Sequence, residues 1–465
     1  MLLSLRGLVL VLLAMGCVSA VFAADSIPAG LHVPVEYYKL PNGLRVTLSP
    51  DHSVPTVVVG VYYRIGFRVE PKDRTGFAHL FEHMMFQGSQ NMGKMEMIKL
   101  VQQNGGILNG STRFDFTNYF EVMPANKLET VLWAEADRMR GLNINEENLK
   151  NQQGVVGNEV KVNVLNRPYG GFPWLDMPQY ANSNWYNAHN FYGDLKDINA
   201  ATLPDVQQFF KTYYAPNNAA LTVVGDFDSA EARKLIEKYF GSLPSVPQAA
   251  QPDLTEPRQE KEKRFTKEDT QAKRPALAVA YHMPDRNTPG FYAMGVIDQI
   301  LLQGDDSLLH EELVKKRAYT GSVDGGINLL GNMFDYNGPM LWMASLFHDN
   351  NVKDDDIVAA MDSVIEPLRT KPVGQATLDR AIVKFRSNLY DQIGQLNGFG
   401  LMDVLASFAL FDDNPERIND IEAQLHKVTP ELVQKTAAEY LRPANRTVLI
   451  VEPKAAENPA SKTGL

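Results

Sequence analysis

Two histidines and a glutamate are grouped in one short stretch, at His79, Glu82 and His83. His79 and His83 are four positions apart, so a helix would place both imidazoles on one face, close enough to bind the same metal ion. Glu82 falls on the same side of that helix. The alternative is that all three are ordinary helix residues satisfied within the core. The neighbouring residues are nearly all apolar, which predicts a helix buried on most sides with its polar groups facing a cleft: Phe77, Leu80, Phe81, Met84, Met85 and Phe86.

Two imidazoles leave a tetrahedral zinc ion short of one protein ligand and a water molecule. The stretch from Glu146 to Val164 is the next expected helix, and it carries Glu159 among several valines. These apolar neighbours favour an inward orientation for Glu159, which makes it a candidate third ligand. Glu82, beside His83, could take a proton from the water as it attacks a carbonyl. On chemistry alone, hydrolysis of bonds other than amides stays open.

The elements that must position these groups are predicted to alternate between strands and helices. Residues 54–63 form a β-branched run, which indicates a core strand leading into the motif helix. After Gly105-Gly106 a second strand is expected to continue through Phe114 to Val122, and its alternation of residue types predicts one buried face. A helix over 128–139 and a strand over 220–224 follow.

A repeat relates two parts of the chain. In both parts, a helix with proline in its first turn leads through a turn into a strand, which predicts two related halves. The alternative is two unrelated units with similar turns. Seven residues recur at a single offset of 227 positions: Thr202, Val206, Gln207, Tyr213, Pro216, Asn218 and Val224 match Thr429, Val433, Gln434, Tyr440, Pro443, Asn445 and Val451.

The two halves are predicted to be joined by a proline-rich linker over 244–257, which lacks periodicity. It separates an N-terminal half, 34–243, from a C-terminal half, 258–453. If Gly304 corresponds to Gly88, the second half has lost the metal-binding motif, and we expect it to bind no metal. The places of His79, Glu82 and His83 are then taken by Gly295, Asp298 and Gln299.

The first residues are typical of a secretory signal peptide. A single basic residue, an apolar run and a small-residue cleavage pattern predict removal of residues 1–23. The only cysteine, Cys17, lies in this segment, so no disulfide would stabilise the mature fold. We expect a secreted protein, in the bacterial periplasm; lipid anchoring through Cys17 is the alternative.

The charge balance argues against a nucleic-acid partner. The chain has 45 Lys and Arg against 55 Asp and Glu, a net charge of −10, and no basic stripe. After the signal peptide no apolar run approaches the roughly 20 residues that a spanning helix needs, so no transmembrane segment is expected.

Several motifs resemble the inverted-motif (H-x-x-E-H) zinc peptidases of the pitrilysin, insulin-degrading enzyme and mitochondrial processing peptidase family, M16. The resemblance implies a zinc cofactor held by His79, His83 and Glu159, with Glu82 as general base. It also implies an α+β fold in which each half is a mainly antiparallel sheet packed against helices, the whole forming half of a clamshell chamber. The matching stretches are His79–His83, Gly106–Thr112, Val155–Glu159 and Asn166–Gly170.

The resemblance extends to peptide binding. Gly106, Leu108 and Asn109 lie in a segment that could offer a sheet edge to an extended peptide; pairing only within its own sheet is the alternative. Relatives also place an arginine and a tyrosine of the second half against the substrate. Here Tyr319 is the possible contact, and Val314 stands where the arginine would align.

Two further implications concern activity and assembly. Many relatives have a Glu-Arg pair where this chain has Gln152 and Gln153, so a second acidic helper is not expected. Shorter members of the family close their chamber with a second chain, which predicts a homodimer or a heterodimer with a related chain lacking the motif. A non-catalytic, peptide-binding or chaperone-like subunit is the competing function, although the four proposed site residues are all present.

Overall fold

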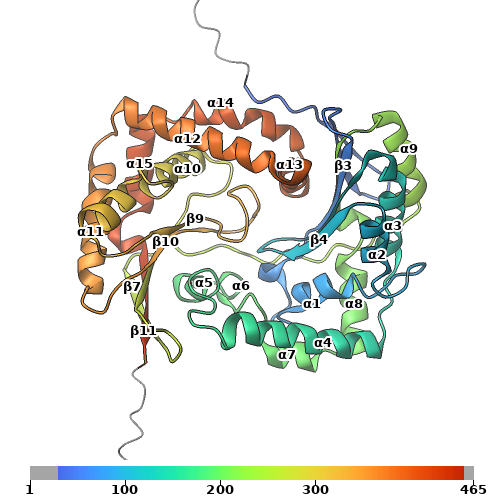
Figure 1. The fold of residues 1–465 in the computed structure, drawn as a ribbon, viewed down its shortest axis with the longest axis horizontal. Coiled ribbons are helices and arrows are strands. Elements are labelled where there is room, and N and C mark those ends of the chain that lie inside the picture. The colour runs from blue at the N-terminus through green and yellow to red at the C-terminus, as the bar shows by residue number, and fades with distance from the viewer. Residues whose placement is uncertain (1–29, 455–465) are drawn as a thin grey trace, which may run out of the picture.

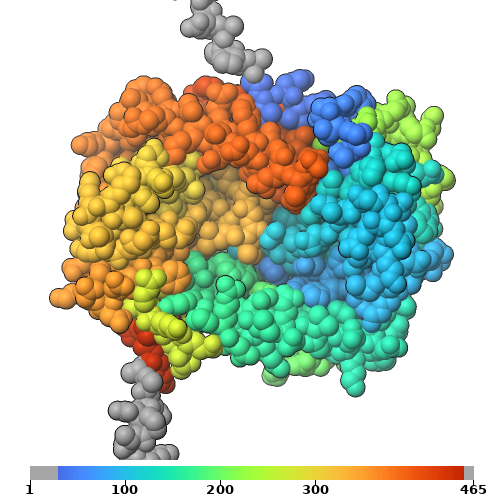
Figure 2. Space-filling model, in the orientation of Figure 1, coloured from blue at the N-terminus to red at the C-terminus, as the bar shows by residue number. Residues whose placement is uncertain are grey.

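Strands and helices alternate along the chain and form two sheets with helices packed on them (Figure 1). The structure, a computed structural model, describes residues 30–454. The predicted signal peptide, 1–23, and Cys17 lie outside the described residues. The architecture is α+β, as predicted, and Figure 2 shows the molecule hollowed at its centre, with segments of both halves around the hollow.

The first sheet has the strand order β1-β2-β6-β3-β5-β4. β2 and β6 are parallel, and the other neighbours are antiparallel. The inner strand β3 is rich in β-branched and aromatic residues and is buried over nearly its whole length. The bounds are β1 (Glu36–Lys39), β2 (Arg45–Pro50), β3 (Thr56–Tyr63), β4 (Ile107–Thr112), β5 (Thr117–Pro124) and β6 (Ala219–Gly225).

Helices of the first half bury their apolar faces on one side of this sheet, in a core that includes residues of α1, α3, α4, α8 and α9. α4 continues into a π-helical segment, Lys161–Leu165. The bounds are α1 (Phe77–Met84), α2 (Glu96–Gln103), α3 (Leu128–Arg140), α4 (Glu146–Val160), α5 (Asp176–Ala181), α6 (Trp185–Ala188), α7 (Leu195–Ala200), α8 (Leu203–Tyr213) and α9 (Ser229–Phe240).

The second sheet, β7-β11-β8-β10-β9, has the connections of the first sheet without a counterpart of β1. β11 pairs parallel with β7 and antiparallel with β8, as β6 does with β2 and β3. The strands are β7 (Lys263–Asp269), β8 (Ala276–His282), β9 (Asp324–Ile327), β10 (Leu341–Phe347) and β11 (Arg446–Pro453); the helices are α10 (Pro289–Leu301), α11 (Asp354–Thr370), α12 (Gln375–Ile393), α13 (Phe399–Asp412), α14 (Ile421–Leu425) and α15 (Pro430–Tyr440).

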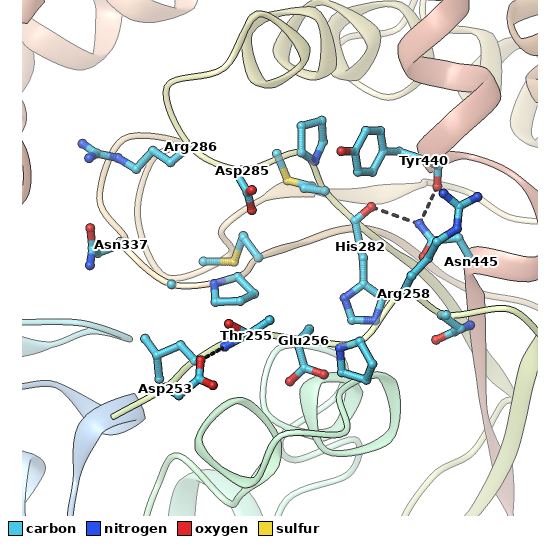
Figure 3. Close-up of a pocket in the computed structure, with 18 of the residues that line it drawn as sticks. Asp253, Thr255, Glu256, Arg258, His282, Asp285, Arg286, Asn337, Tyr440 and Asn445 are labelled. Atoms are coloured by element: carbon cyan, nitrogen blue, oxygen red, sulfur yellow. Dashed lines mark hydrogen bonds between the residues drawn. The ribbon is translucent and has the colours of Figure 1, made fainter. Parts of the chain in front are cut away.

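The predicted repeat is visible in matching hydrogen bonds. The hydroxyls of Thr202 and Thr429 cap α8 and α15. Asn218 donates its amide to the carbonyls of Tyr213 and Arg64, 2.9 and 3.4 Å away. Asn445 does the same to Tyr440 and His282, at 2.6 and 3.0 Å (Figure 3). The two halves are therefore built alike where helix, turn and central strand join.

The prediction of one strand through Phe114 to Val122 is wrong, because the chain turns there. β4 and β5 form an antiparallel hairpin around residues 113–116, where Arg113 donates to the carbonyl of Phe116 at 2.8 Å. The expectation of a single buried face is wrong as well. Both faces of β5 are buried, since Phe120 contacts Phe399 of α13, with ring centroids 4.0 Å apart.

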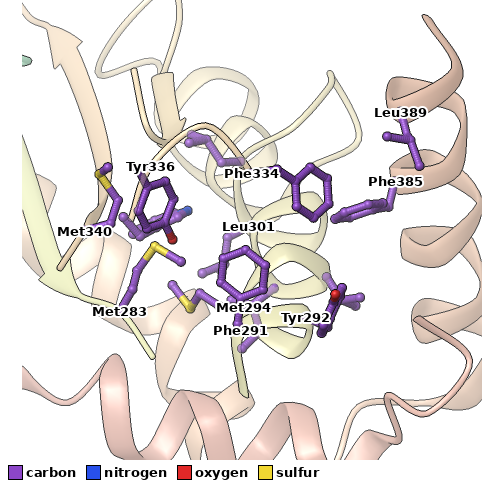
Figure 4. Close-up of a cluster of buried hydrophobic side chains, with 14 of the residues drawn as sticks. Met283, Phe291, Tyr292, Met294, Leu301, Phe334, Tyr336, Met340, Phe385 and Leu389 are labelled. Carbon is purple, nitrogen blue, oxygen red and sulfur yellow. The ribbon is translucent and has the colours of Figure 1, made fainter. Parts of the chain in front are cut away.

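A second-half helix, α13, thus joins the cores of the two halves. It packs on β3 and β6 of the first sheet, and the hydroxyl of Tyr62 donates to Asp403 at 2.5 Å. The core continues into the second half, where aromatic and methionine side chains of α10 and the 333–340 loop pack together (Figure 4). The halves are consequently one packed structure, in spite of their internal similarity.

The predicted linker, 244–257, contains no helix or strand. Its start is held on the first half by hydrogen bonds between Val246 and Asn217, and its later part, from Gln251, lies beside the second half (Figure 3). Together with the residues that follow, it lines a cavity of about 780 Å³. Within residues 30–454 no single helix has the length and hydropathy of a membrane span; only α12 and the 395–412 segment taken together, bent by 65°, reach that composition.

Gly66 controls how closely the β4–β5 turn approaches β3. A Cβ atom there would lie 2.4 Å from the carbonyl oxygen of Arg113 and 2.5 Å from the nitrogen of Phe116. Both are backbone atoms, so relieving the clash would require the turn itself to shift. Gly66→Ala should lower stability by about 1–3 kcal/mol, measured from urea unfolding. Gly321→Ala, where a Cβ meets nothing within 4 Å, is the control. Equal stability of the two variants would contradict this packing account.

Candidate metal centre

The helix that carries the histidines, α1, begins at a buried carboxyl group. Both oxygens of Glu70 accept backbone N–H groups, from Gly76 at 2.8 Å and Ala78 at 2.6 Å. Gly76 has a positive φ of 85°, which glycine adopts without strain. Burial raises the pKa of Glu70 to about 8, although the two N–H groups act in the opposite direction. Glu70 therefore supplies two acceptors that the first turn of α1 needs.

Aromatic packing fixes the rotation of α1. The ring of Phe81 stacks on Phe209 at 4.9 Å and on Phe210 at 6.3 Å, and lies 5.1 Å from the ring of Tyr214. These partners come from α8 and the residue after it. With Phe81 held on this side, His79 and His83 point to the opposite side of the helix, toward α4.

The structure brings together the three residues predicted as ligands. Nε2 of His79 lies 3.5 Å from Oε1 of Glu159, and Nε2 of His83 lies 3.2 Å from Oε2. One ligand atom from each of the three residues can be chosen so that all lie within 4.8 Å of one another. Zinc–ligand bonds of about 2.1 Å in a tetrahedron separate ligand atoms by about 3.4 Å. The donor types and spacing therefore fit one zinc ion.

The electrostatics of the group also favour a cation. Hydrogen bonds with His79 and His83 hold the pKa of Glu159 well below its usual range. Burial lowers the pKa of His83, but the hydrogen bond with Glu159 and the charge of Glu82 outweigh burial and raise it. A contact with Gln152 adds to this rise, so Gln152 reaches the site although it is not acidic.

Glu82 stands beside the cluster and faces β4. Its Oε2 accepts a hydrogen bond of 2.7 Å from the hydroxyl of Thr112, the last residue of that strand. The other carboxylate oxygen, Oε1, makes no such bond with Thr112. This arrangement suits a base better than a ligand, because one oxygen is anchored while the other can take a proton.

Tyr192 completes the site and was missed by the sequence reasoning. Its hydroxyl donates to Oε1 of Glu159 at 2.7 Å, and its ring meets that of His79 edge-on at 5.0 Å. It lies in the loop before α7, where no periodicity or motif marked it. Only the folded structure shows this contact, because 33 residues separate Tyr192 from Glu159.

The predicted peptide-binding residues of β4 and the position before it differ in exposure. β4 is the last strand of its sheet and pairs with β5 alone among the described strands. Asn109 is exposed on this edge and Leu108 packs against the first-half core. A Cβ at Gly106 would lie 2.1 Å from the sulfur of Met123, so close packing alone explains that glycine.

Tyr319 lies in the second half. Its ring packs against the core there, and its N–H donates to the carbonyl of Leu313 at 2.9 Å. None of the hydrogen bonds or aromatic contacts found within residues 30–454 joins it to the histidine cluster. On α10, Asp298 accepts hydrogen bonds from Trp342 at 2.7 Å and Gln303 at 3.0 Å, so its oxygens are engaged within the second half.

Comparison with known proteins places this chain in a family. Residues 45–169 match the family description "Insulinase (Peptidase family M16)", and residues 200–384 match "Peptidase M16 inactive domain". The zinc protease PqqE of Helicobacter pylori is 27% identical over 455 residues, covering 95% of this chain and 98% of that protein. A probable mitochondrial-processing peptidase subunit beta of Arabidopsis thaliana is 25% identical over 211 residues, covering 45% and 39% respectively.

Solved structures share the fold. A protease from Helicobacter pylori superposes with a TM-score of 0.83 at 24% identity, covering 91% of this chain and all of that one. The periplasmic protease PqqL of Escherichia coli matches with a TM-score of 0.72 at 18% identity, covering 91% of this chain but 48% of its own. The half-clamshell architecture expected from the sequence is thus confirmed.

Tyr192→Phe should weaken zinc binding without unfolding the protein. The variant keeps the ring contact with His79 but removes the hydrogen bond to Glu159, and losing such a supporting bond typically costs 10- to 100-fold in metal affinity. Competition with a chelator of known affinity measures the change. Tyr180→Phe, whose ring packs on Phe265, is the matched control. Wild-type zinc affinity in Tyr192→Phe would show that this bond does not support the metal centre.

Proposed function

Since the chain belongs to the M16 family of peptidases, we propose that it is a zinc-dependent endopeptidase acting on peptides or small unfolded proteins. The observation that carries the proposal is the close grouping of His79, His83 and Glu159. A further carboxylate, Glu82, follows on the same helix and is near enough for its charge to raise the pKa of His83. Two imidazoles, a carboxylate ligand and a separate base are the components of a metal-dependent amide hydrolase.

Different residues of the chain would bind the zinc ion, transfer the proton and position the ligands. His79, His83 and Glu159 hold the zinc ion, which when bound polarises the substrate carbonyl and lowers the pKa of the attacking water. Glu82 accepts the proton of that water through the oxygen that Thr112 leaves free, and then gives it to the departing amine. Tyr192 keeps the carboxylate of Glu159 in place.

Strand β4 supports an extended peptide as substrate. Its outer edge carries backbone N–H and C=O groups that pair with no other described strand, so a peptide could add to the sheet there. The strand ends at Thr112, which touches Glu82. A peptide bound along Gly106, Leu108 and Asn109 would therefore run toward the proposed base.

The proposal includes a paired assembly and an extracytoplasmic location. Relatives include a subunit of mitochondrial processing peptidase, and the chain corresponds to about half of PqqL, which is described as periplasmic. We infer that two chains, identical or related, close one chamber in the periplasm. Lipid attachment through Cys17 stays the alternative to a free mature protein.

Glu82→Gln should separate catalysis from zinc binding. The amide keeps the size of the side chain and can still bond with Thr112, but it cannot take the proton. Turnover of a fluorogenic peptide should fall about 10²- to 10⁴-fold while zinc content stays near one per chain. His83→Ala is the contrasting variant, because it removes a ligand and should lose the metal. Zinc loss in Glu82→Gln would make Glu82 a ligand, and full activity would place the base elsewhere.

Thr112→Val should lower kcat with little effect on zinc content. Valine matches threonine in shape but cannot donate the hydrogen bond that holds Glu82, so the carboxylate becomes less well oriented. Thr112→Ser keeps the hydroxyl and should recover most of the activity. If valine and serine lower kcat equally, packing rather than the hydrogen bond explains the loss.

A further inference from the structure

An apolar cavity of about 360 Å³ lies in the first half, away from the metal centre. It is bounded by the end of α3, by α8 and by the start of the linker. A volume of this size is typical of sites for small molecules. Its apolar walls come mainly from Leu142, Ile144, Phe210, Tyr214, Leu243 and Val246.

The charged groups on this cavity are all cations. Arg140 and Lys211 line it, and no acidic side chain does. Within residues 30–454 neither forms an ion pair; Arg140 donates only to the backbone carbonyl of Tyr239, at 3.3 Å. Two cations without counterions are notable in a chain of net charge −10. The cavity thus combines an apolar interior with a positive rim.

We propose that this cavity binds a small amphiphile, an apolar chain with a carboxylate at one end. The chain would occupy the space between Phe210, Leu142 and Leu243, where it loses contact with water. The carboxylate would lie at the rim between Arg140 and Lys211, which supply charge-assisted hydrogen bonds. A neutral or cationic amphiphile of equal length would lack this second interaction.

The cavity is connected to the metal centre through aromatic contacts. Phe210 and Tyr214, which line it, also pack on Phe81. Phe81 immediately precedes Glu82 on α1. A ligand that presses on these rings is therefore positioned to change the orientation of Glu82, and peptide turnover should respond to it.

The binding experiment uses the zinc-loaded full mature chain and three probes below their micellar concentrations. Decanoate, decanol and decylamine share one apolar chain and differ in head-group charge. Isothermal titration calorimetry should show saturable binding, tightest for decanoate, weaker for decanol and weakest for decylamine. Equal affinity for decanoate and decylamine would show that Arg140 and Lys211 do not bind the carboxylate, and would overturn the proposal.

Two variants locate the site. The double variant Arg140→Gln, Lys211→Gln should lower the affinity for decanoate about tenfold and leave the affinity for decanol unchanged. A control double variant, Lys150→Gln, Lys196→Gln, should change neither affinity. Gly141→Leu should weaken binding of both probes, because Gly141 lines the cavity. Its φ of 177° and the absence of any atom within 4 Å of a Cβ there let the backbone accept a larger side chain at this position without strain.

The outcomes decide the proposal independently of peptidase activity. Unchanged decanoate binding in both the Arg140/Lys211 variant and the Gly141 variant would place the ligand elsewhere and refute it. If Gly141→Leu fails to fold, the double variant still tests the rim, since both of its substitutions are at exposed positions. Loss of catalysis in Glu82→Gln with intact decanoate binding would separate this cavity from the active site.

Discussion

The hydrogen bonds that anchor the first turn of α1 on Glu70 are the constraint on which the site depends. A helix turns about 100° per residue, so a small rotation of α1 would carry both imidazoles away from α4. The cap fixes where the helix begins, and the stacking of Phe81 on Phe209 fixes which side faces inward. Glu159, on a separate helix, can then meet His79 and His83 at the same point. The geometry of the three candidate ligands is thus set by contacts that none of the three makes itself.

The sequence predicted the parts of the site that are local. The spacing of His79 and His83 implies proximity on any helix, and Glu159 was indicated by its apolar neighbours on the next expected helix and by the resemblance to a known family. Thr112 and Tyr192 were given no role, because their contacts depend on how distant segments fold together. Thr112 reaches Glu82 from the last position of β4, and Tyr192 reaches Glu159 from an irregular loop. Neither contact follows from periodicity.

The errors in the predicted strands have a related cause. Alternation of apolar and polar residues along a strand indicates one buried face only when the other face is exposed to solvent. In β5 the second face is covered by α13, which comes from far along the chain, so Asn118, Phe120 and Val122 are buried as well. The turn at 113–116 was hidden because Phe114 and Phe116 read as strand residues, although the structure buries them in the joint core.

The second half supports the site in spite of lacking its motif. The turn of the β4–β5 hairpin carries Asp115, whose carboxylate pairs with buried Arg68 at 2.9 Å and accepts the N–H groups of Asn337 and Gly338. Arg68 in turn donates to the carbonyl of Pro339 at 2.7 Å. Removing one partner of a buried ion pair is costly, about 3–5 kcal/mol, so this network holds the hairpin firmly against the second half. Because β4 ends in Thr112, whose hydroxyl bonds to Glu82, the second half is linked to the proposed base through the hairpin, without contributing a metal ligand of its own.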